Sequence, residues 1–141
     1  MNILVTGAAG FVGKNLIAQL ENIRDGREKT SPLSKELTIF SCTRKTSKEE
    51  LEQFCKEADF VIHLAGVNRP KDEREFMEGN ADFLEQILGL LKEHQNKATV
   101  LLASSIQASL DNPYGRSKKA GEEILKEYGK CTGANVLVYR F

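Results

Sequence analysis

The sequence predicts an α/β protein built on one doubly wound parallel sheet. Two observations predict this class: short apolar runs alternate with helical patterns along the whole chain, and a glycine-rich turn follows the first run. Right-handed crossovers between parallel strands would place the helices on both faces of the sheet. We expect about five strands, at residues 1–6, 36–41, 59–65, 98–103 and 135–139.

The expected helices follow from periodicity and capping signals. Apolar residues recur at helical spacing from the glycine turn to Ile23, and again over residues 71–94. A helix over 47–55 is expected because Ser47 and Glu50 have the spacing of a capping box. The last helix is expected to begin at Pro113, after a capping Asp111 or Asn112, and to end near Gly129.

The composition of the chain is that of one soluble domain. It has 141 residues, of which 40% are hydrophobic and 28% are charged. The 20 basic and 20 acidic side chains balance, so charge gives no reason to expect nucleic acid or an anionic membrane as a partner. No secretory signal and no run long enough to span a bilayer is visible. The three cysteines and two histidines are dispersed, which indicates free thiols in the cytoplasm and no metal site.

Three glycines lie between the first strand and the first helix, in the context of a dinucleotide-binding turn. Gly7 would turn the chain sharply, Gly10 would let backbone N–H groups approach a pyrophosphate, and Gly13 would let the helix pack closely. The unpaired N–H groups at the helix start favour phosphate binding. The spacing is GxxGxxG rather than GxGxxG, and the alternative is a tight turn with helix-packing glycines.

The segment after the second strand favours NADP(H) over NAD(H). NAD sites usually carry an acidic residue there, to bind the ribose 2′-hydroxyl group. This chain instead has Arg44 and Lys45, and Arg44 suits a bidentate grip on a 2′-phosphate. The alternative is a solvated loop with two ordinary surface charges.

Tyr114 and Lys118 would stand one turn apart on one face of the last long helix. A nearby ammonium stabilises a phenolate, so the tyrosine could exchange protons while the lysine also binds a cofactor ribose. Ser104 and Ser105 follow the fourth strand, where ligands gather in open α/β sheets, and a hydroxyl there could hold a substrate carbonyl. The alternative is a half-buried tyrosine beside a solvated lysine.

Four segments resemble the extended short-chain dehydrogenase/reductase family: TGAAGFVG (6–13), HLAG (63–66), the Ser104–Ser105 pair and YGRSK (114–118). The resemblance implies a Rossmann fold, a nicotinamide cofactor and usually a nucleotide-sugar substrate. It implies that Tyr114 is the catalytic acid/base, Lys118 its partner and Ser105 the catalytic serine. Together with the glycine turn and Arg44, it implies these cofactor-binding residues: Gly7, Ala8, Gly10, Phe11, Val12, Gly13, Arg44, Leu64, Ala65, Gly66, Asn80 and Lys118.

Within that family, residues 63–70 (HLAGVNRP) and 104–122 (SSIQASLDNPYGRSKKAGE) resemble CapF-type proteins of capsular polysaccharide synthesis. That resemblance implies NADPH-dependent reduction of the C4 ketone of a UDP-linked 6-deoxy-hexosulose, towards precursors of N-acetyl-L-fucosamine. CapF-type proteins continue into a substrate-binding region and a metal-binding cupin domain, so residues 1–141 are expected to be the NAD(P)-binding domain of a longer reductase. A strand of the usual fold is also missing between Arg44 and Asp59.

Two alternative functions remain at this point. One is UDP-sugar epimerisation or dehydration by the same family, and the other is a non-catalytic dinucleotide-binding module or inactive fragment. His63 is expected to be a core histidine bonded at one nitrogen, while Arg69 and Gln107 are weaker candidates for the site. An exposed edge at the last strand would be compatible with a homodimer.

Overall fold

The computed structural model describes residues 1–33, 35–66 and 71–141, and it contains one sheet of five parallel strands. The strand order is β2-β1-β3-β4-β5. The strands are β1 (Asn2–Thr6), β2 (Thr38–Cys42), β3 (Phe60–His63), β4 (Thr99–Ser104) and β5 (Val136–Arg140). The predicted fold class, a doubly wound parallel α/β sheet, is therefore confirmed.

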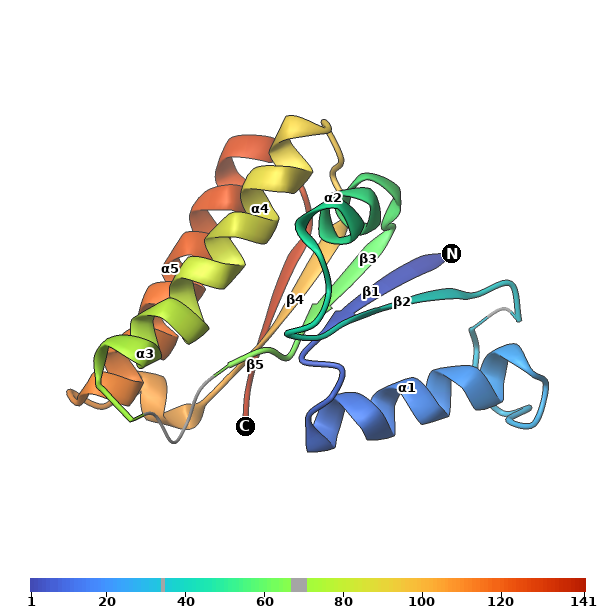
Figure 1. The fold of residues 1–141 in the computed structure, drawn as a ribbon, viewed down its shortest axis with the longest axis horizontal. Helices are drawn as coiled ribbons and strands as arrows, with labels where there is room; N and C mark the ends of the chain where they lie inside the picture. The colour runs from blue at the N-terminus through green and yellow to red at the C-terminus, as the bar shows by residue number, and fades with distance from the viewer. Residues whose placement is uncertain (34, 67–70) are drawn as a thin grey trace.

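Helices cover both faces of the sheet, as predicted (Figure 1). The helical elements are α1 (Phe11–Arg24), α2 (Lys48–Glu57), α3 (Arg74–Met77), the π-helix η1 (Glu78–Asp82), α4 (Phe83–Glu93), the 3₁₀-helix η2 (Ile106–Ser109) and α5 (Pro113–Thr132). One apolar core joins α2, α4 and α5 to one face of the sheet, and a smaller core joins α1 to the other.

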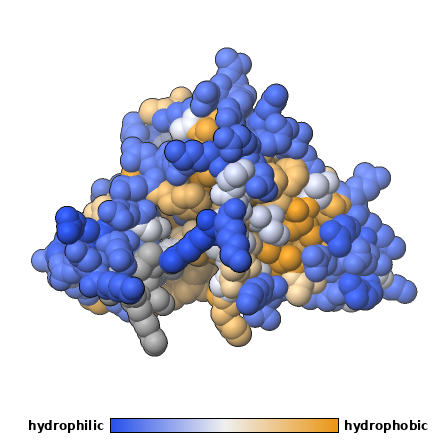
Figure 2. Space-filling model, in the orientation of Figure 1, coloured by the Kyte–Doolittle hydropathy of each residue, from blue (hydrophilic) through white to orange (hydrophobic). Residues whose placement is uncertain are grey.

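The surface in the view of Figure 2 is mostly hydrophilic, with apolar side chains gathered between β2 and α1. Leu16, Ile17 and Ile39 are partly buried there, against the smaller core. The face of the sheet that packs against α1 is less well covered over β5, where Leu137 is 40% exposed and Tyr139 is 54% exposed. The helix α1 therefore shields the half of this face formed by β2, β1 and β3.

The boundaries of most elements lie within two residues of the predicted ones. The capping box is present as predicted, because Ser47 Oγ accepts from the Glu50 N–H and the Glu50 carboxylate accepts from the Ser47 N–H. The pattern over 71–94 was expected to be one helix, but η1 interrupts it and divides it into α3 and α4. At its other end α5 passes Gly129 and stops before Gly133, which has a left-handed φ of 77°.

The strand order positions a ligand site. The chain leaves β1 for β2 on one side and returns through α2 to β3 on the other side, with no further strand between them in the described residues. Because the strands are parallel, the carboxyl ends of all five lie along the same side of the sheet, which is called here its carboxyl edge. Ligands of open α/β sheets bind outside that edge, where the strand order reverses.

The larger core predicts the stability of one matched pair of variants. Leu125 is 0% exposed, so Leu125→Ala should lower the free energy of unfolding by about 2–5 kcal/mol through lost contacts and a cavity. Ile106 is 67% exposed, and Ile106→Ala should change it by about 0.5 kcal/mol or less. Urea denaturation of both variants checks this, and equal losses would contradict the described core.

Candidate active site

The glycine turn between β1 and α1 lies against the backbone that follows β3. Gly7 has a φ of 67°, a backbone conformation that residues with a side chain rarely adopt. A Cβ at this position would lie 2.8 Å from the Ala65 nitrogen. A Cβ on Gly13 would lie 2.1 Å from the Gly7 carbonyl oxygen. Both glycines are therefore required by close backbone contacts. Gly10 is exposed, so a ligand can approach its backbone.

The start of α1 is open to an anion. Gly10 is the N-cap residue, so no side chain caps the helix, and its first turn contains no acidic residue. The amides of Phe11, Val12 and Gly13 are in that first turn, and the side chains of Phe11 and Val12 are 84% and 58% exposed. Unpaired N–H groups and the positive end of the helix dipole make this a suitable seat for a phosphate.

Arg44 lies beside this turn. The Ala8 N–H donates to the Cys42 carbonyl, so the end of β2 is held next to the glycine turn. A tight turn follows, closed by the Thr46 N–H donating to the Thr43 carbonyl, and it exposes Arg44 and Lys45. These two cations are therefore near the glycine turn, without a described ion pair.

Ser105 directly follows β4 at the same edge of the sheet. It is 8% exposed, and its Oγ accepts a hydrogen bond of 3.1 Å from the Gln107 N–H. This bond caps the short helix η2. Because the Oγ accepts there, its own hydrogen stays available to a substrate oxygen.

Tyr114 and Lys118 lie on one face of α5, near its start. Asn112 caps the helix, since its side chain accepts from the Gly115 N–H at 2.7 Å. The Lys118 Nζ lies 5.7 Å from the centre of the Tyr114 ring, and that ring forms a T-shaped pair with the Phe76 ring. Burial lowers the pKa of Lys118 from its ordinary value. The predicted proximity of the two side chains is present.

Gly66, Asn80 and Lys118 lie close together. A Cβ on Gly66 would lie 2.7 Å from the Asn80 Oδ1 and 3.0 Å from the Lys118 Nζ. Asn80 is 3% exposed in the π-helix η1, and its Nδ2 donates to the Ser117 Oγ at 3.0 Å. Extra turns of this kind often occur at functional sites. Segments 64–66, 78–82 and 113–118 therefore converge beside the pair.

The close packing around α5 depends on small residues that the sequence reasoning did not single out. A Cβ on Gly115 would lie 2.3 Å from the Gln107 carbonyl oxygen, and one on Gly121 would lie 2.8 Å from the Asn80 carbonyl oxygen. Ser117 is 0% exposed and donates to the Tyr114 carbonyl. The helical spacing of Ser117 and Gly121, on the face that carries Lys118 and Tyr114, was the available signal.

An ion pair between the buried Glu122 of α5 and the part-exposed Arg140 of β5 was also missed. Glu122 is 2% exposed, and both of its carboxylate oxygens accept from the Arg140 guanidinium at 2.8 Å. The Ser104 Oγ donates to the same carboxylate at 2.7 Å. Arg140, and to a smaller extent Ser104, lower the pKa of Glu122, against the effect of burial.

His63 is a fully buried histidine bonded at one nitrogen, as predicted. Its Nδ1 lies 2.9 Å from the Thr6 Oγ1, and its Nε2 has no partner among the described residues. Burial, with a smaller effect of the Lys118 charge, lowers the pKa of His63 to about 3. The imidazole is therefore neutral at physiological pH.

The comparisons with known proteins agree with this geometry. The model of the NAD dependent epimerase/dehydratase family matches residues 3–141. The chain belongs to that family. The resemblance seen in the sequence is thus confirmed, as is its enzyme class, NAD(P)-dependent oxidoreductases of the extended short-chain dehydrogenase type.

Individual relatives are similar over nearly the whole chain. A UDP-2-acetamido-2,6-beta-L-arabino-hexul-4-ose reductase of Pseudomonas aeruginosa is 39% identical over 99% of this chain and 35% of its own length. The capsular polysaccharide assembling protein CapF of Staphylococcus aureus is 43% identical, with a TM-score of 0.78, over 100% of this chain and 34% of its own. RMD of P. aeruginosa, solved with NADPH, is 27% identical with a TM-score of 0.76, over 99% of this chain and 54% of its own. This chain thus spans about a third of the length of the first two relatives.

The sequence also offered two weaker candidates for the site. Arg69 is outside the described residues, and Gln107 is exposed, with its N–H used by Ser105. In the described part of the chain no helix is long and apolar enough to cross a membrane. Nor is there, in that same part, a group of three potential metal ligands.

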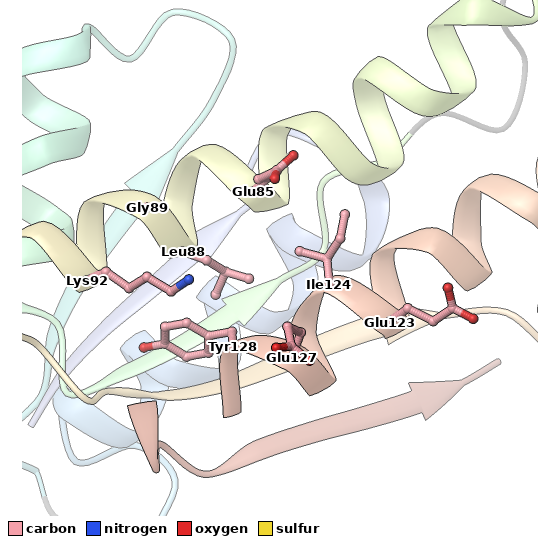
Figure 3. A pocket seen from close by; sticks show the side chains of 8 residues that line it. All are labelled: Glu85, Leu88, Gly89, Lys92, Glu123, Ile124, Glu127 and Tyr128. Atoms are coloured by element: carbon pink, nitrogen blue, oxygen red, sulfur yellow. The ribbon is translucent and has the colours of Figure 1, made fainter. Parts of the chain in front are cut away.

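A groove between α4 and α5 is separate from the candidate site (Figure 3). Its lining is Glu85, Leu88, Gly89, Lys92, Glu123, Ile124, Glu127 and Tyr128, and it includes none of the predicted site residues. Three carboxylates against one ammonium disfavour a phosphate-bearing ligand. A family cofactor would therefore not be expected there.

The glycine contacts predict opposite effects of one substitution at two helical positions. Gly115→Ala should lower the melting temperature, because its methyl group would overlap the Gln107 carbonyl oxygen. Gly89→Ala should raise the stability by about 0.5–1 kcal/mol, because nothing lies within 4 Å of its Cβ and alanine favours the helix. Thermal unfolding measures both, and a stabilising Gly115→Ala would contradict the close contact.

His63 predicts a pH dependence of stability. Its pKa is depressed in the folded state, so between pH 6.5 and about 3 the unfolded chain binds a proton that the folded chain does not. The free energy of unfolding should therefore fall on acidification, at up to about 1.4 kcal/mol per pH unit. Urea midpoints at about pH 5 to 7 should show a smaller slope in His63→Asn than in the wild type. The control Ile106→Ala, at an exposed position without a titratable group, should keep the wild-type slope.

Proposed function

We propose that the chain is the NADPH-binding part of a reductase that acts on the C4 ketone of a UDP-linked 6-deoxy-hexosulose. The observation that carries this proposal is the convergence of Tyr114, Lys118, Asn80 and Gly66 beside the glycine turn, at one edge of the sheet. Residues 1–141 then constitute the NAD(P)-binding domain of a longer enzyme of capsular polysaccharide synthesis, located in the cytoplasm.

The residues of the turn fit a dinucleotide. The uncapped start of α1 would hold the pyrophosphate through the amides near Gly10, and Leu64, Ala65 and Gly66 would line the cofactor. Arg44 would bind the 2′-phosphate, which supports NADPH over NADH. Bound there, NADPH would supply a hydride to the substrate carbonyl carbon.

The chain's own side chains would handle the substrate oxygen. The Ser105 hydroxyl would donate a hydrogen bond to the carbonyl oxygen, and Tyr114 would give its proton to that oxygen as it becomes an alcohol. Lys118 would stabilise the resulting phenolate and bind the cofactor ribose. Asn80, whose Oδ1 lies close to Gly66, would hold η1 against the start of α5 through Ser117.

The relatives support the choice of substrate. The P. aeruginosa relative is named as a reductase of a UDP-linked hexul-4-ose, and the S. aureus relative assembles capsular polysaccharide. Productive hydride transfer needs the substrate to be held in place, and the longer protein would supply those contacts. A homodimer also remains part of this proposal.

Titration of the purified chain with NADPH and NADH tests the proposal. NADPH should raise the melting temperature and bind more tightly than NADH, because only NADPH has the 2′-phosphate for Arg44. Arg44→Ala should weaken NADPH binding by about tenfold, the loss expected for a charge-assisted contact, and leave NADH binding unchanged. Nucleotide fluorescence gives both dissociation constants.

Arg27→Ala is the matched control. Arg27 is an exposed cation beyond the end of α1, so this variant should bind NADPH like the wild type. Equal affinity of the wild type for both nucleotides would contradict the role of Arg44. Binding of neither would contradict the proposal for this chain, and tightly retained NAD⁺ would favour epimerisation or dehydration.

A further inference from the structure

Glu122 is unusual because its charged side chain is buried. A glutamate side chain is almost never fully buried unless it is paired, and here the side chain is 3% exposed. Its carboxylate accepts three hydrogen bonds, two from Arg140 and one from Ser104. The two bonds from Arg140 form a bidentate pair, which restricts orientation as well as distance.

The three residues come from three elements. Glu122 is on α5, one turn after Lys118, and Ser104 is the last residue of β4, directly before Ser105. Arg140 ends β5 and pairs with Ser104 in the sheet. Backbone bonds continue this link, because the Phe141 N–H donates to the Ser104 carbonyl and the Ile106 N–H donates to the Phe141 carbonyl.

We propose that Glu122 and Arg140 are positioning residues that hold the helix carrying Tyr114 and Lys118 in register with the strand that ends at Ser105. The inference rests on the proposed function, because it treats Ser105, Tyr114 and Lys118 as the reacting groups. Neither Glu122 nor Arg140 touches the substrate in this scheme. They act through the placement of α5 against β4.

The polar character of the contact supports positioning over simple stabilisation. Glu122 is buried, whereas the Arg140 side chain is 43% exposed. A partly exposed ion pair contributes little to stability, and even a fully buried pair can often be replaced by apolar residues of similar volume without loss, so stability alone gives little reason for the pair. Apolar packing tolerates small shifts of a helix, whereas three directed hydrogen bonds do not. A displacement of about 1 Å at a reacting group can lower a rate by about a hundredfold.

The experiment separates position from stability in the whole 141-residue chain. Arg140→Leu breaks the pair and leaves a buried carboxylate. The triple variant Ser104→Ala, Glu122→Met, Arg140→Leu removes all three polar groups and keeps an apolar contact. Glu123→Gln, next to Glu122 on the exposed face of α5, is the control. The readouts are the melting temperature, the NADPH dissociation constant, and deuterium uptake of a peptide spanning 105–118 relative to one containing β1.

The proposal predicts different recoveries for stability and for binding. Arg140→Leu should lower both the melting temperature and the affinity for NADPH. The triple variant should regain most of the melting temperature but still bind NADPH about tenfold more weakly than the wild type, because Lys118 is displaced from the ribose. Its uptake over 105–118 should stay raised while β1 stays protected. Glu123→Gln should match the wild type in every readout.

Recovery of NADPH affinity together with stability in the triple variant would overturn the proposal, since the pair would then be only structural. If the triple variant does not fold, Arg140→Lys replaces it, because lysine keeps the charge and loses the bidentate geometry. Affinity and uptake equal to the wild type in that variant would then overturn the proposal. If the wild type binds no NADPH, the proposed function fails, and the uptake of the 105–118 peptide alone decides whether the pair positions α5.

Discussion

The parallel pairing of β1 with strands on both of its sides is the constraint on which the rest of the structure depends. It places the ends of β1, β2 and β3 next to one another, with Thr6 beside Cys42 on one side and His63 on the other. The glycine turn, the turn that carries Arg44 and the segment at Gly66 each begin at one of these ends. Because the backbones are in contact, with Gly7 against Ala65 and Ala8 against Cys42, small residues are required there.

The helix α5 organises the opposite half of the site by a similar principle. Its glycines let the Gln107 and Asn80 backbones approach, and its polar groups bind Asn80, Ser104 and Arg140. The buried side of a single helix therefore combines the tyrosine–lysine pair with the contacts that place it. Among the described residues, the buried side-chain polar atoms are bonded, as low polarity inside a protein requires, with His63 Nε2 of β3 as the exception.

The fold could be predicted from the sequence because its signals are local. Apolar runs, the Ser47–Glu50 capping box, Pro113 and the three glycines each determine the structure of their own segment. The Tyr114–Lys118 proximity was also predictable, since helical spacing sets it. The π-turn at Asn80 and the Glu122–Arg140 pair were not. Both depend on contacts between segments far apart in the chain, and an isolated Glu122 resembles any surface glutamate.

The parallel sheet also has a consequence for how the chain reaches its native state. In the register of β1, Leu4 pairs with Phe40 and with Val61, so neither partner strand is a near neighbour in the sequence. No two of the described strands form a hairpin, and each of their pairings must close a long loop before its hydrogen bonds form. Topologies dominated by distant pairings fold slowly for their size. During synthesis the apolar strand β1 would therefore stay unpaired until its partners, dozens of residues later in the chain, have been made. In this interval the chain would be most prone to aggregate.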